Sequence, residues 1–148
     1  MKKFLLYFVI LSLSLTLISC QEKSIMQTRQ IKVNGQLLNV AVAETISQMA
    51  KGLSGRQSLA ENEGMLFIYP DYQIRYFHMK DMNFPLDIIW IKDNIIAGIE
   101  ENVPVLTEGK ITKVKSNVSV NRVLEINAGW ASNYGVRVGD KIEFMEFD

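Results

Sequence analysis

Short apolar segments separated by turn signals run through most of the sequence, and this pattern constrains the fold more than any other feature. Apolar side chains alternate with a period of two in residues 31–33 and 40–42, on either side of Asn34-Gly35, a pair typical of hairpin turns. A continuous apolar run at 64–69, closed by Pro70-Asp71, is typical of a buried strand. Further strands are predicted at 75–79, 86–91, 95–99, near Ile111, at 122–126 and at 136–144, the last interrupted by Gly139-Asp140.

Only two places favour a helix, and both are short. Thr45 is followed three residues later by Gln48, which is the spacing of a capping box, and Gly52 can end this helix. Residues 128–134 favour a single helical turn. Many short strands with so little helix predict a mainly β fold, a single compact antiparallel sandwich or barrel formed by residues 31–148.

The first 19 residues are typical of a bacterial lipoprotein signal peptide. Lys2-Lys3 precede a run of 15 uncharged residues, which is shorter than the ~20 residues that a membrane-spanning helix needs. The run ends in Leu-Ile-Ser-Cys, which resembles a lipobox, so we expect a lipid on Cys20 and a tether over residues 20–30. The alternative is an uncleaved anchor helix with an incidental cysteine. Either way, we expect the domain outside the cytoplasm, at the periplasmic face, in the outer membrane or at the cell surface.

Charge and composition argue against several classes of function. The 148 residues contain 16 basic and 16 acidic side chains, and the two lysines of the signal segment leave residues 20–148 with 14 basic and 16 acidic groups. We therefore expect no nucleic-acid partner, because proteins that bind phosphates are normally basic. His78 and Cys20 are the sole histidine and cysteine, so no metal site is expected. No cofactor motif and no catalytic set is found, and the oligomeric state stays open.

A series of short motifs follows along the chain. They are Gly52-Leu53 with Arg56, Gly64-Met65-Leu66-Phe67, Phe77-His78-Met79-Lys80, Pro85-Leu86-Asp87-Ile88-Ile89, Val123-Leu124-Glu125 and Gly139-Asp140. In this order, over about residues 38–146, they resemble the domain of unknown function 192 family. The resemblance implies a compact, mostly β, jelly-roll-like domain that is often exported and has no established activity. The family commonly has Trp at the place of His78 and Asn-Thr at Asp81-Met82, so no ligand identity is transferred to this chain.

The candidate ligand-binding residues lie within these motifs. They are Arg56, Met79, Lys80, Asp87 and Glu125. Asp87 stands in an apolar run and is either a structural acid that accepts hydrogen bonds from the 77–83 backbone or a carboxylate at a pocket rim. In the second case Arg56 or Lys80 is its partner. Glu125 is either solvated, if its strand neighbours fill the core, or paired with one of the same two cations.

Met79 and three other residues have a structural interpretation beside a functional one. Met65 and Met79 are either core fillers or ligand contacts. His78 is either simply exposed or catalytic, and Trp130 either caps an apolar edge or offers a stacking surface for a sugar.

Three functions are compatible with these residues. The first is a lipid-anchored, non-enzymatic domain that binds a polar small molecule, a carbohydrate or an envelope partner. The alternative is a hydrolase or lyase acting on envelope material with Asp87 and Glu125 as acid and base, which requires both side chains on one face of the fold. The third is a structural accessory to an envelope complex.

Overall fold

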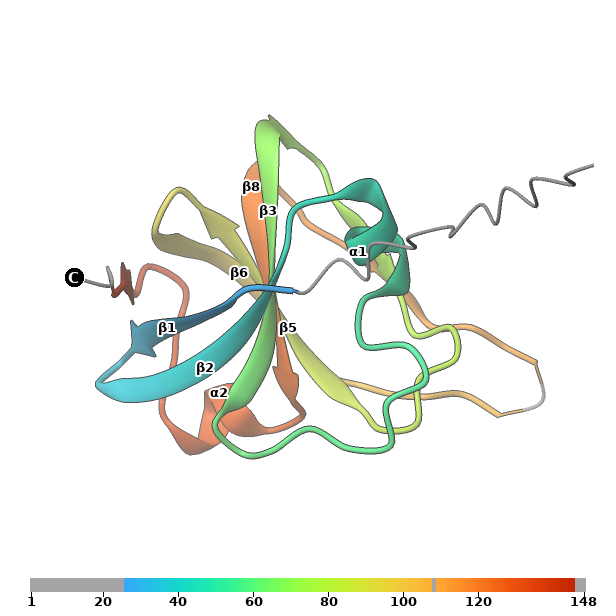
Figure 1. Ribbon diagram of the computed structural model, residues 1–148. Helices are drawn as coiled ribbons and strands as arrows, with labels where there is room; N and C mark the ends of the chain where they lie inside the picture. The colour runs from blue at the N-terminus through green and yellow to red at the C-terminus, as the bar shows by residue number, and fades with distance from the viewer. Residues whose placement is uncertain (1–25, 108, 146–148) are drawn as a thin grey trace, which may run out of the picture.

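The computed structural model describes residues 26–107 and 109–145, and the chain in these ranges is mainly β (Figure 1). The predicted signal peptide, Cys20 and the first half of the tether lie outside the described residues. The strands are β1 (Thr28–Val33), β2 (Gln36–Ala43), β3 (Glu63–Gln73), β4 (Tyr76–His78), β5 (Leu86–Lys92), β6 (Ile95–Val103), β7 (Lys113–Lys115), β8 (Val120–Asn127) and β9 (Ile142–Phe144), and the helices are α1 (Ile46–Lys51) and α2 (Trp130–Asn133). The predicted mainly β fold with two short helices is confirmed.

Seven strands form one curled sheet, a half-barrel, in the order β6-β5-β8-β3-β2-β1-β9, and β4 pairs with β7 separately. Neighbouring strands of the large sheet are antiparallel except β2 and β3, which run parallel. The chain between them, which includes α1, returns from the end of β2 to the start of β3, and a return connection of this kind makes parallel neighbours. This pair is one exception to the predicted antiparallel arrangement.

The two edge strands of the large sheet meet at one end. Ile95 and Lys141 form a β-bridge, the Ile96 N–H donates to the Asp140 carbonyl at 2.9 Å, and the Gly139 N–H donates to the Ile96 carbonyl at 2.8 Å. These bonds satisfy backbone groups that an open edge would leave unpaired. The curled sheet therefore surrounds a core on its inner side.

The predicted capping box is formed at the start of α1. The Gln48 N–H donates to Thr45 Oγ1 at 3.2 Å, and the Gln48 side-chain oxygen accepts from the Thr45 N–H at 3.1 Å. Gly52 ends the helix with a φ of 50°. None of the residues of α1 is fully buried, so the helix packs only loosely on the sheet.

Several strand ends differ from the prediction. β3 continues past Pro70 to Gln73, because its pairing with β8 is irregular in this stretch and proline is tolerated where the ladder is interrupted. The strand predicted at 136–144 is limited to β9, since the Arg137 N–H donates to Asp140 Oδ2 at 2.8 Å and closes a turn before it. The strand expected near residue 111 lies at β7, two residues further along.

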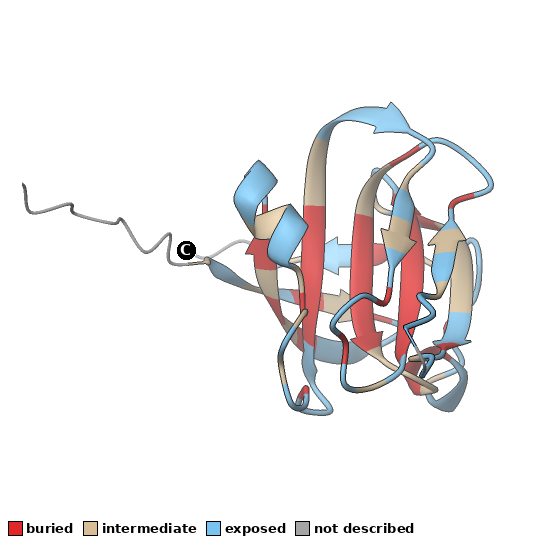
Figure 2. Ribbon diagram, turned by 90° about the vertical axis from the view of Figure 1, so that its right-hand side faces the viewer, coloured by how far each residue is buried: buried red, intermediate tan, exposed pale blue. Residues whose placement is uncertain are grey.

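Both faces of the central strands are buried, which produces two apolar clusters (Figure 2). The inner cluster comprises Ile31, Val33, Leu38, Val40, Leu66, Ile89, Ile91, Ile96, Leu124, Ile126, Trp130, Ala131, Val136 and Ile142. The outer cluster comprises Ala43, Leu53, Leu59, Met65, Phe67, Met79, Met82, Leu86, Ile88, Trp90, Val103, Val120 and Val123. A strand that is buried on both faces reads as a continuous apolar run, which accounts for residues 86–91.

Candidate functional site

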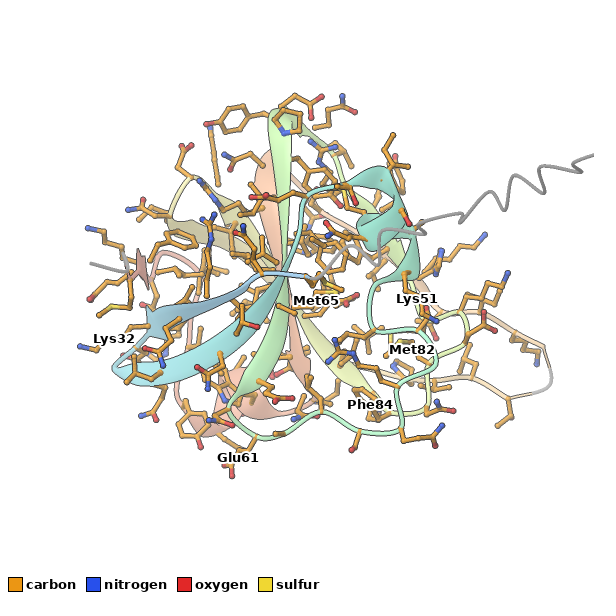
Figure 3. All side chains as sticks on the ribbon, viewed as in Figure 1. Lys32, Lys51, Glu61, Met65, Met82 and Phe84 are labelled. Carbon is orange, nitrogen blue, oxygen red and sulfur yellow. The ribbon has the colours of Figure 1, made fainter. Side chains whose placement is uncertain are left out.

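A cavity of about 110 Å³ opens on the outer face of the sheet, beside the end of α1. Its walls come from α1 and the turn after it, from β3 and β4, and from one side chain of β8. The lining residues are Met49, Ala50, Lys51, Gly52, Leu53, Ser54, Phe67, Tyr69, Tyr76, Phe77, His78, Met82 and Glu125. Figure 3 shows Lys51 and Met82 on the side of the molecule that α1 covers. We call this cavity the Glu125 pocket.

Glu125 is the acidic side chain that lines this pocket, and it is 6% exposed. Its Oε2 atom is buried and has no hydrogen-bond partner among the described residues. Burial raises the pKa of the Glu125 carboxyl to about 8, although the positive charge of Arg56 lowers it. At neutral pH the carboxyl is therefore mostly protonated and offers both a donor and an acceptor to the pocket.

The expectation that Glu125 is solvated is wrong, because β8 is buried on both faces. Val123 and Glu125 share the outer face, while Leu124 and Ile126 belong to the inner cluster. The pairing alternative is met only in part, since Arg56 acts on the carboxyl through its charge and forms no ion pair with it.

Gly52 keeps space open next to the Glu125 carboxyl. A Cβ atom at Gly52 would lie 3.9 Å from Glu125 Oε2 and 3.5 Å from Phe67 Cζ. The φ of 50° at this helix end also disfavours any residue with a side chain. The glycine that ends α1 therefore also shapes the pocket.

Aromatic rings form the walls of the pocket and hold one another in place. The Phe67 and Phe77 rings meet edge to face with centroids 4.9 Å apart, and Phe77 packs in the same way on Trp90 at 5.7 Å. Burial raises the pKa of the Tyr69 hydroxyl, the positive charge of Arg75 lowers it, and Glu125 raises it. The Arg75 guanidinium lies 3.7 Å from the Tyr69 ring centroid.

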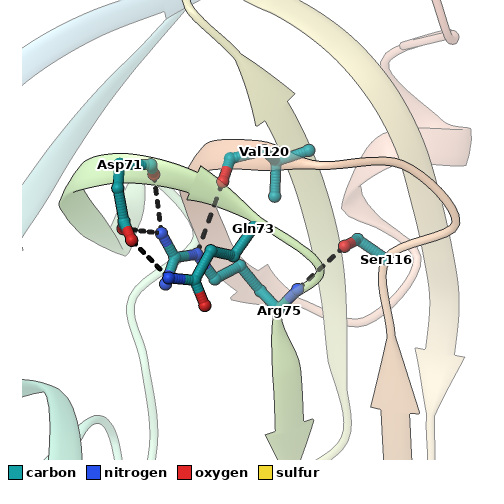
Figure 4. Close-up of polar contacts among 5 residues, drawn as sticks. All are labelled: Asp71, Gln73, Arg75, Ser116 and Val120. Atoms are coloured by element: carbon teal, nitrogen blue, oxygen red, sulfur yellow. Dashed lines mark hydrogen bonds and ion pairs between the residues drawn. The ribbon is translucent and has the colours of Figure 1, made fainter.

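Arg75 holds this side of the pocket in place through several polar contacts (Figure 4). Its Nη2 donates to the Asp71 carbonyl at 2.6 Å and pairs with the Asp71 carboxylate, and its Nε donates to the Val120 carbonyl at 3.4 Å. The Arg75 N–H donates to Ser116 Oγ at 3.0 Å. These bonds tie the start of β4 to β3 and to the β7–β8 connection, and so fix the side of the pocket opposite α1.

Basic and aromatic side chains surround the mouth of the pocket. Lys51 ends α1, and Tyr76 and His78 lie on β4; all three are exposed. In the β4–β7 pair, Tyr76 is opposite Lys115 and His78 is opposite Lys113, and both lysines are exposed. The entrance therefore carries positive charge, while the interior carries one acid.

Asp87 lies on the other face of the sheet and is fully buried. Its Oδ1 accepts from the N–H groups of Asn102 at 2.8 Å and Gly129 at 3.0 Å, and its Oδ2 accepts from the Ala131 N–H at 2.9 Å. This geometry is that of the structural acid, with the correction that the amides come from β6 and the start of α2 rather than from residues 77–83. Its oxygens are occupied by the backbone.

The two carboxylates cannot act together on one substrate. In the β5–β8 register, Ile88 is opposite Glu125 and Asp87 is opposite Ile126, so the two acids point to opposite faces. The acid–base pair required by the hydrolase or lyase alternative is therefore not formed.

The other three predicted residues do not line the Glu125 pocket. Arg56 borders a separate hollow near β2 and the start of β3, where its carbonyl accepts from the Asn83 side chain at 2.7 Å. Met79 is buried in the outer cluster, as a core filler is, and borders another hollow together with Lys80. Of the five predicted ligand-binding residues, Glu125 therefore lines this pocket, and the other four lie elsewhere in the structure.

Sequence reasoning missed most of the pocket walls, namely Lys51, Tyr69, Tyr76 and Phe77. Their approach depends on how α1 and the β4–β7 pair cover the sheet, and no local pattern reports that. One signal was present: Val123, Leu124 and Ile126 around Glu125 are all apolar, which is typical of a strand with two buried faces.

Two absences hold within residues 26–107 and 109–145. No three His, Cys, Asp or Glu side chains there come together as a metal site would require. In the same ranges, no helix has the length and apolar character needed to cross a membrane.

The fold and the pocket define a class of protein: a small β half-barrel in which Glu125, whose buried Oε2 has no hydrogen-bond partner among the described residues, lines a small pocket. The sequence profile of the DUF192 family, described as "Uncharacterized ACR", matches residues 29–144, and the chain belongs to this family. The resemblance seen in the motifs is thereby confirmed. No curated protein matches the sequence.

Two bacterial crystal structures are similar to this chain. One is a protein from Sinorhizobium meliloti 1021, proposed as a transcription regulator, which is 32% identical, with a TM-score of 0.72 over 80% of this chain and 95% of that one. The other is a protein of unknown function from Novosphingobium aromaticivorans DSM 12444, which is 31% identical, with a TM-score of 0.73 over 82% and 89% of the two chains. Both support the fold and neither assigns a ligand.

Proposed function

We propose that this chain is a non-enzymatic binding domain that takes the end group of a small polar molecule into the Glu125 pocket. One observation carries the proposal: Glu125 lines an open cavity, and its Oε2 atom is buried without a hydrogen-bond partner among the described residues. Leaving a buried polar atom unpaired costs ~1–3 kcal/mol. A ligand that pairs with this atom would recover that free energy on binding.

The size of the pocket favours an end group rather than a whole ligand. Pockets that enclose a drug-sized molecule have volumes of ~300–1,000 Å³, whereas this cavity has about 110 Å³. An apolar cavity of ~150 Å³ accepts the six heavy atoms of benzene, so about four heavy atoms fit here. A polar small molecule is therefore favoured over a carbohydrate, whose ring would have to stay outside. An envelope partner would have to insert a single side chain.

We propose a place for this binding domain as well. The uncharged run after Lys2-Lys3 and the Leu-Ile-Ser-Cys sequence support export and attachment through a lipid on Cys20. The domain would then sample ligands outside the cytoplasm, at the periplasmic face of a membrane or at the cell surface. Mass spectrometry of the protein from membranes tests this, and an intact, unmodified chain that starts at Met1 would contradict it.

A thermal-shift screen of the full-length chain in detergent tests the binding function. The compounds are amino acids, amines, sugars, nucleotides and cell-wall fragments. We expect some of them to raise the Tm of the wild-type chain by several degrees, because a ligand that binds only the folded state stabilises it.

A blocked pocket provides the control. Ala50 is exposed on α1 and lines the pocket, so Ala50→Trp should fill the mouth and abolish the shift. Ser47 is exposed on the same helix and does not line the pocket, so Ser47→Trp should leave the shift unchanged. The proposal is wrong if no compound shifts the Tm, or if both tryptophan variants respond as the wild-type chain does.

A further inference from the structure

We propose that the ligand of the Glu125 pocket is a small zwitterion, whose methylated ammonium group enters against Glu125 and the aromatic rings while its acidic group stays at the mouth beside Lys51 and His78. This inference rests on the proposed function and names the class of ligand for the same site. It rests on the separation of charge between the interior and the entrance of the pocket.

The interior of the pocket has the chemistry that recognises a methylated ammonium. Phe67 and Phe77 present aromatic rings, the Tyr69 ring already has the Arg75 guanidinium 3.7 Å from its centroid, and Glu125 is the acid beside them. A cation within about 6 Å of a ring centroid is attracted to the ring face, and sets of such rings are the usual site for quaternary ammonium groups. Met49 and Met82 add polarizable thioether groups that pack well on methyl groups.

A methylated ammonium fits better than a primary one. A primary ammonium brings three N–H donors that each need an acceptor, and Glu125 is the one carboxyl among the lining residues. A trimethylammonium group needs no hydrogen bond, and its nitrogen and three methyl carbons are the roughly four heavy atoms that the cavity admits. Its positive charge is balanced when Glu125 gives up its proton to solvent, so the site gains no net charge.

The entrance of the pocket favours an acid. Lys51 and His78 line the mouth, and Lys113 lies opposite His78 on β7. Among the described residues the one ion pair joins Asp71 and Arg75, so Lys51 has no carboxylate partner there. A ligand that carries only a cation would be repelled by the positive charge at the mouth. A zwitterion places its acidic group beside that charge and is attracted by it.

The charged and titratable groups that face Glu125 come from three sides. They are Lys51 and Arg56 from α1 and the segment after it, Tyr69 from β3, and Tyr76 and His78 from β4. Apart from Glu125 none is acidic at neutral pH. The ligand's ammonium therefore has one counter-charge in the pocket, and Glu125 supplies it.

Four matched probes test the inference by calorimetry on the full-length chain in detergent. Glycine betaine carries both charges, choline carries the cation alone, 3,3-dimethylbutyrate carries the anion alone, and 3,3-dimethylbutan-1-ol carries neither. All four share a branched head of the same shape. We expect glycine betaine to bind at least tenfold more tightly than each of the other three.

Two variants assign the charges to residues. Glu125→Gln should weaken the affinity for glycine betaine at least tenfold and leave the affinity for 3,3-dimethylbutan-1-ol within twofold. The glutamine keeps the shape of the Glu125 side chain and cannot become negatively charged. Lys51→Gln should reduce the preference for glycine betaine over choline at least threefold, and Lys51→Arg should restore it. Lys32 lies on the far side of the molecule (Figure 3), so Lys32→Gln is the matched control and should change nothing.

The outcomes separate this inference from the proposed function. If the uncharged alcohol or choline binds as tightly as glycine betaine, the inference of a zwitterionic ligand is wrong, while the proposed binding function of the pocket stands. If none of the four probes binds, the zwitterion is again wrong, and the wider thermal-shift screen decides the binding function. A response to glycine betaine that is unchanged in Glu125→Gln also overturns the inference.

Discussion

Each face of the central sheet buries one acidic side chain, and the two side chains differ in their hydrogen bonding. On the inner face, Asp87 accepts three backbone N–H groups and is closed in by α2. On the outer face, Glu125 lines a cavity of about 110 Å³, and its buried Oε2 has no hydrogen-bond partner among the described residues. Both side chains are nearly inaccessible to solvent, so burial alone does not distinguish the two acids. The number of hydrogen-bond partners does.

The covers of the two faces explain the difference. The inner face is enclosed by the curl of the sheet itself, with β1, β9 and α2 all contributing to its cluster. The outer face is covered by α1, which buries none of its own residues, and by the three-residue strands β4 and β7. A sheet that closes on itself packs tightly, whereas separate short elements leave space between them.

The largest expected effect is that of Asp87→Asn. An amide in place of the carboxylate keeps one acceptor oxygen and turns an NH₂ group toward a backbone N–H, so we expect a loss of about 4 kcal/mol in the free energy of unfolding. Urea denaturation measures it, and Asp81→Asn at an exposed position serves as control. A loss below about 1 kcal/mol would mean that the three amides do not depend on this charge.

The pH dependence of stability should differ between wild type and Glu125→Gln. Because the pKa of Glu125 rises from its ordinary value of 4.5 to about 8, the folded chain holds a proton that the unfolded chain releases between these pH values. This contribution to stability is complete below pH 4.5 and is lost as the pH rises to about 8. We expect wild type to lose about 3 kcal/mol more than Glu125→Gln between pH 5 and pH 8 in urea titrations. Parallel pH profiles for the two proteins would show that Glu125 titrates normally.

Gly52→Ala should affect the outer face in two ways. The positive φ at this position makes the alanine unfavourable by about 2 kcal/mol, and its methyl group would lie 3.9 Å from Glu125 Oε2 and narrow the pocket. Gly35→Ala is the matched control, since Gly35 also has a positive φ but no atom lies within 4 Å of its Cβ position. Both variants should lower the Tm, and Gly52→Ala alone should weaken ligand binding. If the two variants bind the ligand equally well, Gly52 does not contribute to the shape of the binding pocket.

The smallest expected effect is that of Thr45→Ala, which removes the side-chain half of the capping box at α1. The loss of an N-cap oxygen costs ~1 kcal/mol. Because α1 covers only the outer face, hydrogen exchange should accelerate in α1 and leave the inner-face amides of Gly129 and Ala131 protected. Faster exchange on both faces would mean that the two faces unfold as one unit.

The sequence predicted the local parts of this fold well. The Asn34-Gly35 turn joins β1 and β2, the capping box forms at Thr45, and the apolar runs become β3, β5 and β8. The parallel β2–β3 pair was not predicted, because it depends on where the chain between these strands returns. Of the candidate site residues, Glu125 reaches a pocket, whereas Asp87 points to the opposite face of the sheet.

The amino-acid sequence by itself determined the turns, the helix caps and the strands, since each depends on residues a few positions apart. It also determined that two acids would stand within apolar strands. Only the tertiary structure decided their roles, because the amides that bind Asp87 come from 15, 42 and 44 residues away. The aromatic rings that line the pocket with Glu125 come from β3, which pairs with β8 in the large sheet, and from β4, which pairs with β7 outside it. Hydrogen-bond partners at such distances along the chain are set by packing, and no local pattern records them.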